Sequence, residues 1–225
     1  MGVHNVTATA TPKMAGIKMQ KRSVSPYFRK TPAFIFFTLQ REVKFLNVEF
    51  TRYDITLQRL TEGKIEMVRK WRNDPKISKY MEYRDTITPE MQKAWFHRID
   101  NPRNYYFIIL FEGKEIGLAD VKDIDAVGKT GEGGLFIYND GYQNSEVPFR
   151  AVLALNDFCF SSLGLKTMIA HIMRDNPRAI EFNRALGYVQ DTAEASLTKL
   201  KYILSKEDYF KHRDQIARFL GVHKS

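Results

Sequence analysis

The sequence is poor in cysteine, since Cys159 is the single one among 225 residues. This excludes an internal disulfide and any zinc or iron–sulfur site built from several cysteines. Long apolar runs are also missing, and residues 33–37 fall far short of the roughly 20 residues that span a bilayer. No glycine-rich nucleotide fingerprint occurs, and the five histidines have no ligand partners at metal spacing. We therefore expect a soluble, cytoplasmic protein with no metal and no membrane span.

Acidic residues are scarce near the start of the chain, where none precedes Glu42. Residues 1–50 hold eight Lys/Arg and two Asp/Glu, so this segment carries six of the nine net positive charges. The remainder carries little net charge, which argues against a nucleic-acid-binding surface. The first part is also rich in Ser, Thr and Pro and has no helical or strand period. We interpret residues 1–48 as a flexible basic extension, with a transit peptide, a poor secretory signal or an upstream start site as alternatives.

From residue 49 on, β-type runs and amphipathic helices follow one another without a visible linker. Helices are expected after Thr61, at Thr88-Pro89, over residues 147–162, at Asn176-Pro177 and after Ser205, because these sites combine cap residues with apolar stripes. Strands are expected at residues 55–59, 105–111, 115–121, 135–138, 167–171, 188–189 and 197–204. This order predicts one domain, residues 49–225, in which helices flank a mixed sheet.

Three local motifs are more specific than the element order. Trp71-Arg72-Asn73 follows the first helix, a strand–loop–helix unit covers residues 132–163, and residues 176–188 read N-x-x-A-I-x-x-x-x-x-L-G-Y. Together they resemble the GNAT superfamily of acetyl-CoA-dependent N-acetyltransferases over about residues 53–210. The first motif is most similar to the branch with ribosomal-protein acetyltransferases and amino-sugar acetyltransferases of the pseudaminic acid type. The resemblance implies an α/β (mixed α+β) fold with a central, mostly antiparallel mixed sheet flanked by helices.

The resemblance also implies where acetyl-CoA, the acetyl donor, would bind. Pantetheine would meet the backbone where two strands splay, and the pyrophosphate would meet backbone N–H groups at the start of the next helix. The residues at matching positions are Leu135, Phe136, Ile137, Tyr138, Gln143, Asn144, Ser145, Glu146, Val147, Asn176 and Asn183. Both glycines of the family's phosphate loop are replaced, by Glu146 and Pro148. A degenerate fold that serves only in binding or regulation is therefore an alternative.

Acetyl transfer to an amine needs a group that takes the amine proton and one that protonates the leaving thiolate. Glu132 matches a glutamate common at the head of the corresponding strand in this branch, and a bulge at Gly133-Gly134 would turn it toward the cleft. An ordinary strand-edge carboxylate is the alternative interpretation. Many members of the family carry a tyrosine that protonates the thiolate. Asn183 stands at the matching position here, so Tyr138 and Tyr142 are the candidates for this acid.

The early helices and their connection would wall the acceptor side. Candidate residues there are Trp71, Arg72, Asn73, Tyr80 and Met81. Aromatic side chains can stack on a base and Arg72 can meet a phosphate, which favours a nucleotide-linked amino sugar as the small-molecule amine acceptor. A protein N-terminus is the alternative acceptor, and Trp71 alternatively belongs to the core. The sequence leaves open whether the protein is a monomer or a homodimer.

Overall fold

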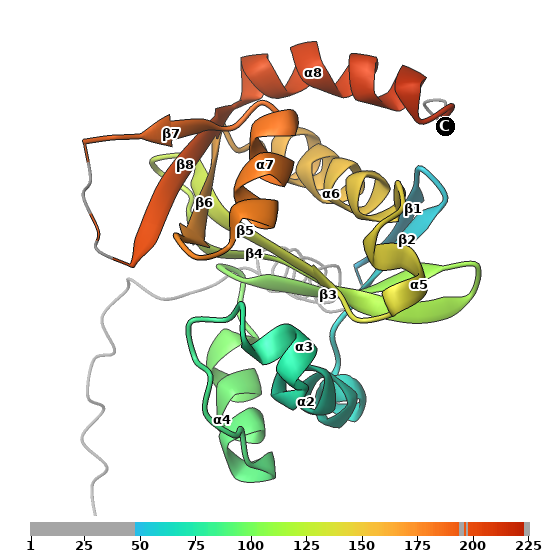
Figure 1. The fold of residues 1–225 in the computed structure, drawn as a ribbon, viewed down its shortest axis with the longest axis vertical. Coiled ribbons are helices and arrows are strands. Elements are labelled where there is room, and N and C mark those ends of the chain that lie inside the picture. Colours follow the sequence, from blue (N-terminus) through green and yellow to red (C-terminus); the bar gives the residue numbers. More distant parts are fainter. Residues whose placement is uncertain (1–47, 194–195, 197, 223–225) are drawn as a thin grey trace, which may run out of the picture. The chain divides into compact units, whose positions relative to one another are not determined.

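The computed structural model describes residues 48–193, 196 and 198–222. They form one eight-stranded sheet with the strand order β1-β2-β3-β4-β5-β6-β8-β7 (Figure 1). All neighbouring pairs are antiparallel except β5 with β6, which confirms the predicted mostly antiparallel mixed sheet. The strands are β1 Glu49–Arg52, β2 Ile55–Arg59, β3 Tyr105–Phe111, β4 Lys114–Asp125, β5 Thr130–Ile137, β6 Thr167–Met173, β7 Val189–Asp191 and β8 Lys199–Ser205. The predicted extension, apart from Val48, lies outside the described residues.

Helices cover both faces of this sheet (Figure 1). They are α2 Ile65–Asn73, α3 Pro75–Ser78, α4 Pro89–Ile99, α5 Asp140–Gln143, α6 Val147–Asp157, α7 Pro177–Ala185 and α8 Lys206–Phe219. The larger apolar core joins α6 and α8 to one face, through fully buried residues such as Phe107 and Leu153. The smaller core joins α2 and α4 to the other face around Val68, Phe96 and Ile108. None of the described helices has the length and apolar character needed to cross a membrane.

Side-chain caps define where three of the helices begin. Thr88 Oγ1 accepts a hydrogen bond from the Met91 N–H at 3.2 Å, and Ser205 Oγ accepts one from the Asp208 N–H at 3.0 Å. Asn176 Oδ1 likewise accepts from the Ala179 N–H at 3.1 Å. Each cap satisfies one of the N–H groups that the first turn leaves without a partner. The starts predicted from these residues are confirmed.

Several elements differ from the prediction, and β4 and β5 are longer than the runs 115–121 and 135–138 expected for them. The strand β1 and the short helices α3 and α5 were not expected from the sequence, because each has only four residues. The expected helix over residues 147–162 consists of α6 followed by the π-helical turn Phe158–Ser162. These differences leave the order of the longer elements unchanged.

The strands β5 and β6 separate partway along their length. They pair in parallel only from Thr130 to Glu132, whereas β5 remains paired with β4 as far as Ile137. The backbone of residues 133–137 therefore faces β6 without a ladder partner. The irregularity in the β4–β5 ladder lies between Lys122 and Asp125, so the bulge predicted at Gly133-Gly134 is wrong. Ordinary alternation along β5, together with the pairing of Lys122 and Glu132, turns Glu132 toward the α2–α4 face.

Candidate active site

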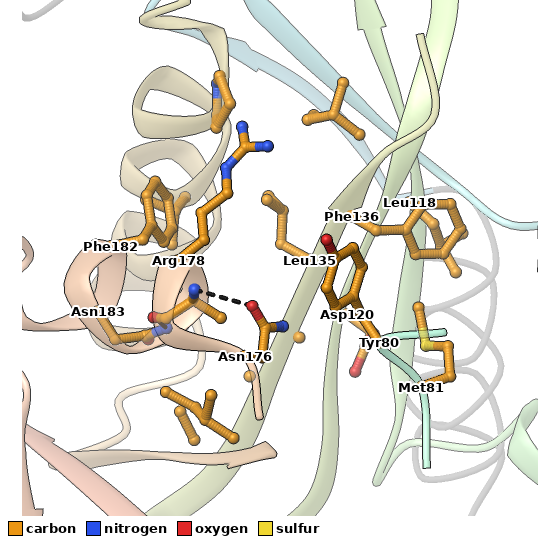
Figure 2. Close-up of a pocket in the computed structure, with 18 of the residues that line it drawn as sticks. Tyr80, Met81, Leu118, Asp120, Leu135, Phe136, Asn176, Arg178, Phe182 and Asn183 are labelled. Carbon is orange, nitrogen blue, oxygen red and sulfur yellow. Dashed lines mark hydrogen bonds between the residues drawn. The ribbon is translucent and has the colours of Figure 1, made fainter. Parts of the chain in front are cut away.

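A cavity of about 1130 Å³ opens where β5 and β6 part. One wall comes from α7, with Arg178, Phe182 and Asn183, and Leu135 of β5 lies opposite (Figure 2). Tyr80 from the segment after α3 borders the other end of the same space (Figure 2). Pockets for one small molecule are usually about 300–1,000 Å³, so this cavity has room for a donor and an acceptor together.

The strand edge expected to meet the donor lines this cavity at three of its four positions. Leu135, Phe136 and Ile137 belong to the lining. Tyr138 lies behind the wall, where its ring stacks on Trp71 with centroids 5.3 Å apart. The Tyr138 hydroxyl donates to Asp74 Oδ2 at 3.2 Å. Tyr138 is therefore a packing residue in this structure and does not reach the space between the strands.

The loop before α6 uses most of its backbone donors internally. The Asn144 and Ser145 N–H groups both donate to the Tyr142 carbonyl, and the Val147 N–H donates to Ser145 Oγ at 3.2 Å. Three of the four N–H groups of residues 144–147, where the resemblance implies that the pyrophosphate binds, therefore already have acceptors within the loop. Gln143, Asn144 and Ser145 line the cavity, whereas Glu146 and Val147 do not. Anion binding here requires some of these internal bonds to be exchanged.

Arg178 places a positive charge beside this loop, and the sequence analysis did not predict it. The Arg178 guanidinium, from the first turn of α7, donates to the Gln143 carbonyl and lines the cavity. Its sequence signal is weak, because an arginine after a capped helix start is usually a solvated side chain. Asn176 and Asn183, which are predicted to contact the cofactor, line the cavity, and each is hydrogen-bonded within α7: Asn176 caps it, and Asn183 Nδ2 donates to the Ala179 carbonyl at 2.8 Å.

The predicted acceptor residues divide into two groups. Arg72, Tyr80 and Met81 line the cavity. Trp71 is 7% exposed and belongs to the smaller core, as the alternative interpretation had it. Asn73 holds the chain before α4, because its Nδ2 donates to the Ile87 carbonyl at 2.9 Å and its Oδ1 accepts from the Ile87 N–H at 2.8 Å. Neither Trp71 nor Asn73 is in position to touch an acceptor.

Arg72 is a cation without an acidic partner. Its guanidinium carbon lies 5.3 Å from the centre of the Trp95 ring, and no carboxylate of the described chain is within ion-pair distance. Burial lowers the Arg72 pKa, and the interactions of Arg72 with Tyr106 and Asp120 oppose this change. Even so, an arginine stays protonated at any physiological pH. The acceptor wall therefore offers a half-buried positive charge to an anionic group.

Glu132 reaches the cavity with both carboxylate oxygens engaged. Lys122 Nζ lies 2.9 Å from Oε1, and His171 Nδ1 lies 2.8 Å from Oε2. Burial by itself raises the Glu132 pKa, but the hydrogen bonds and charges of Lys122 and His171 outweigh burial and lower it. Lys122 and His171 also line the cavity, and no motif in the sequence pointed to either of them. Glu132 is thus a stable anion held between two donors.

Asp120 is a second carboxylate on the same face, and sequence reasoning missed it. It lies on β4 opposite Gly134 of β5 and lines the cavity (Figure 2). Burial raises its pKa to about 7, with the Glu132 charge acting in the same direction and the charges of Lys122 and Arg72 opposing. The only sequence signal was an acid inside the β-type run 115–121, a position where side chains are usually apolar.

The described part of the chain has no cluster of metal-binding side chains and no reactive thiol. No group of three or more His, Cys, Asp or Glu side chains there is placed to hold a metal ion. Cys159 is fully buried in the larger core, and burial raises its pKa, so it stays a thiol at neutral pH. The charged side chains that matter here are those of the cavity.

Residues 54–189 match the family model described as acetyltransferase (GNAT) domain. Among solved structures, apo FdhC, described as a nucleotide-linked sugar GNAT, has a TM-score of 0.65 and 24% identity, covering 78% of this chain and 99% of FdhC. The spermidine N-acetyltransferase from Vibrio cholerae, in complex with CoA and spermine, has a TM-score of 0.60 and 17% identity. That alignment covers 70% of this chain and 98% of the other. No curated protein sequence matches significantly.

Proposed function

The chain belongs to the GNAT acetyltransferase family and is an N-acetyltransferase, and we propose that it acetylates the primary amine of a nucleotide-linked amino sugar. The observation that carries this proposal is Arg72, a half-buried cation without an acidic partner on the acceptor wall. A nucleoside diphosphate supplies the matching anion, and Arg binds phosphate oxygens in bidentate geometry. Tyr80 and Tyr83, 46% and 43% exposed, line the same part of the cavity and can stack on the base.

A polyamine acceptor fits the acceptor wall less well. Spermidine carries several positive charges, which Arg72 would repel. Lys76 and Glu82 also line the cavity, but each already has a partner of opposite charge, Asp140 Oδ2 at 3.0 Å and Lys199 Nζ at 2.6 Å. A protein N-terminus is the second candidate acceptor, as the resemblance to the branch with ribosomal-protein acetyltransferases implies.

For the donor we propose acetyl-CoA, which acetyltransferases of this family use. The unpaired edge of residues 133–137 fits the amide groups of pantetheine, because two backbones can pair there as strands do. Arg178 fits a phosphate at the loop before α6, where it now donates to the Gln143 carbonyl. When bound, the thioester supplies an activated acetyl group. The residues of this chain hold the donor, orient the amine and accept its proton.

Glu132 belongs to the proposed catalytic site, as the sequence predicts. In this proposal its carboxylate holds Lys122 and His171 in place and adds a fixed negative charge beside the acceptor. That charge favours the approach of an amine and disfavours a second ionised carboxylate close by.

The acceptor is tested with a panel of amines at equal concentration. It comprises uridine and thymidine diphosphate amino sugars, spermidine, and peptides with free N-termini, with CoA release followed by a thiol reagent. We expect release with one or more of the nucleotide sugars and little with the others. Acetylation of spermidine or of the peptides, with no sugar accepted, would contradict the proposed acceptor and leave the acetyltransferase assignment intact.

Replacing Arg72 with alanine should raise the KM for the nucleotide sugar by about 10- to 100-fold, because a hydrogen bond to a charged group contributes about 1.5–3 kcal/mol. The KM for acetyl-CoA should change little. Steady-state kinetics with each substrate varied in turn measures both constants. Lys70→Ala is the control, since Lys70 is exposed on the same helix and does not line the cavity. Equal changes in both KM values would indicate a general disturbance of α2.

Arg178→Ala should weaken acetyl-CoA binding, because it removes the cation beside the loop before α6. In a thermal-shift titration the wild-type melting temperature should rise with acetyl-CoA, since a ligand stabilises the state that binds it. The variant should need a clearly higher concentration for the same rise. Arg184→Ala on the exposed side of α7 is the control and should behave as wild type. A wild type that shows no rise would instead support the degenerate, non-catalytic alternative.

A further inference from the structure

We propose that Asp120 accepts the proton of the acceptor amine, and that Glu132 acts as a positioning residue that sets the charge around it. The proposal rests on the N-acetyltransferase activity and not on which amine is the substrate. It also reassigns the base, because the sequence alone pointed to Glu132.

The Asp120 carboxylate lies against the backbone of β5. An ideal Cβ on Gly134 would lie 2.7 Å from Asp120 Oδ1 and 3.0 Å from Oδ2, closer than side-chain atoms approach in proteins. The missing side chain at Gly134 therefore lets the carboxylate lie against the β5 backbone. This point is next to the edge where β5 has lost its β6 partner, which is the edge proposed to hold the acetyl donor.

The Asp120 carboxylate also has unused hydrogen-bonding capacity. Within the described chain no group donates a hydrogen bond to Asp120, whereas Glu132 is held by Lys122 and His171. A carboxylate in a cavity wall without a donor is costly unless a ligand or water supplies one. The N–H of an amine in the cavity is a donor of the right kind.

Charged and titratable groups from several elements surround Asp120. The groups that interact electrostatically with Asp120 are Arg72 of α2, Tyr106 of β3, Lys122 and Asp123 of β4, and Glu132 of β5. Cys159, in the core on the other side of the sheet, also interacts with it. Burial is the largest influence and favours the protonated acid, Glu132 and Asp123 add to it, and Lys122 and Arg72 oppose it. The outcome, a pKa of about 7, suits a base that must both take and release a proton near neutral pH.

In the proposed step, the acetyl group passes from the CoA sulfur to the amine nitrogen. The neutral amine nitrogen forms a bond to the acetyl carbon, the carbon–sulfur bond breaks, and its electron pair leaves with the CoA sulfur. One proton of the amine passes to the Asp120 carboxylate. That proton then leaves to solvent, and the CoA thiolate takes up a proton from solvent, so the products are an N-acetyl amide and CoA.

The ionisation of Asp120 can be measured without any substrate. Protein labelled with carbon-13 at the aspartate carboxyl carbons is titrated by NMR, and the Asp120 resonance is the one missing in Asp120→Asn. We expect it to titrate near pH 7 in the wild type. In Glu132→Gln it should titrate at lower pH, because the neighbouring negative charge is gone and Lys122 is released. A resonance that titrates below pH 5 in the wild type would overturn the proposal.

The rate measurement uses the best acceptor of the amine panel, over a range of pH. At low pH the amine and Asp120 must both lose a proton, so log kcat/KM should rise with a slope of two in the wild type. Asp120→Asn should reduce the slope to one and lower kcat/KM at pH 8 by about 10²–10⁴-fold, the usual contribution of a general base. Glu132→Gln should keep the slope of two, but the pH range over which this slope is seen should be lower.

Asp125→Asn is the control, because Asp125 is exposed at the end of the same strand and does not line the cavity. It should retain the wild-type rate and slope. If Asp120→Asn keeps the wild-type rate and slope while Glu132→Gln loses both, Glu132 is the base and the proposal fails. If the sugars fail as acceptors but the slopes hold with another amine, only the proposed acceptor is wrong.

Discussion

Replacing Asp157 with asparagine is expected to lower the free energy of unfolding by about 3–5 kcal/mol, the cost of breaking a buried ion pair by removing one partner. The Asp157 side chain is 2% exposed. Its Oδ2 accepts from Arg52 and from the Tyr53 hydroxyl, and its Oδ1 accepts from the Tyr209 hydroxyl at 2.8 Å and from Arg213 at 3.2 Å. One carboxylate thus joins the β1–β2 turn, α6 and α8.

Urea unfolding followed by circular dichroism measures this change, provided that the slope with urea stays the same. Asp85→Asn is the matched control. Asp85 is exposed, and no hydrogen bond or ion pair within the described residues involves its side chain. The control should stay within about 0.5 kcal/mol of the wild type. A loss below about 1 kcal/mol for Asp157→Asn would show that solvent reaches this network and replaces the lost charge.

Replacing Gly134 with alanine is expected to lower kcat/KM by about 100-fold, the effect that a displacement of about 1 Å can have on a reacting group. The new methyl group would lie 2.7 Å from Asp120 Oδ1, so the carboxylate must move away from β5. The KM for acetyl-CoA and the melting temperature should change much less than the rate.

A double-mutant cycle with Asp120→Ala tests the cause. The alanine at position 120 has no carboxylate to displace, so adding Gly134→Ala should then have little further effect. Gly63→Ala is a control for a glycine-to-alanine change without a clash, because a Cβ there would meet only Thr61 Oγ1, at 4.0 Å. Independent, additive losses would mean that Gly134 acts through the donor edge of β5 and not through Asp120.

The sequence by itself determined the family, the fold class and the starts of several helices. Thr88, Asn176 and Ser205 act on N–H groups three residues away, so the information that they carry is contained in a short stretch of chain. The motif over residues 176–188 is equally local. The alternating apolar pattern of the longer strands likewise depends only on neighbours in sequence.

The tertiary structure decided which side chains meet. Folding brings Lys122 to Glu132 across the β4–β5 pair and brings His171 to it from 39 residues away. It also places Asp120 beside Gly134, where no side chain occupies the space. Trp71 lies in the core, stacked on Tyr138. The apolar stripe of its helix left this open, because such a stripe does not tell which of its members lies at the edge of the core. A pKa depends on burial and on charges brought close by folding, so the ionisation of these carboxylates follows from strand register and packing.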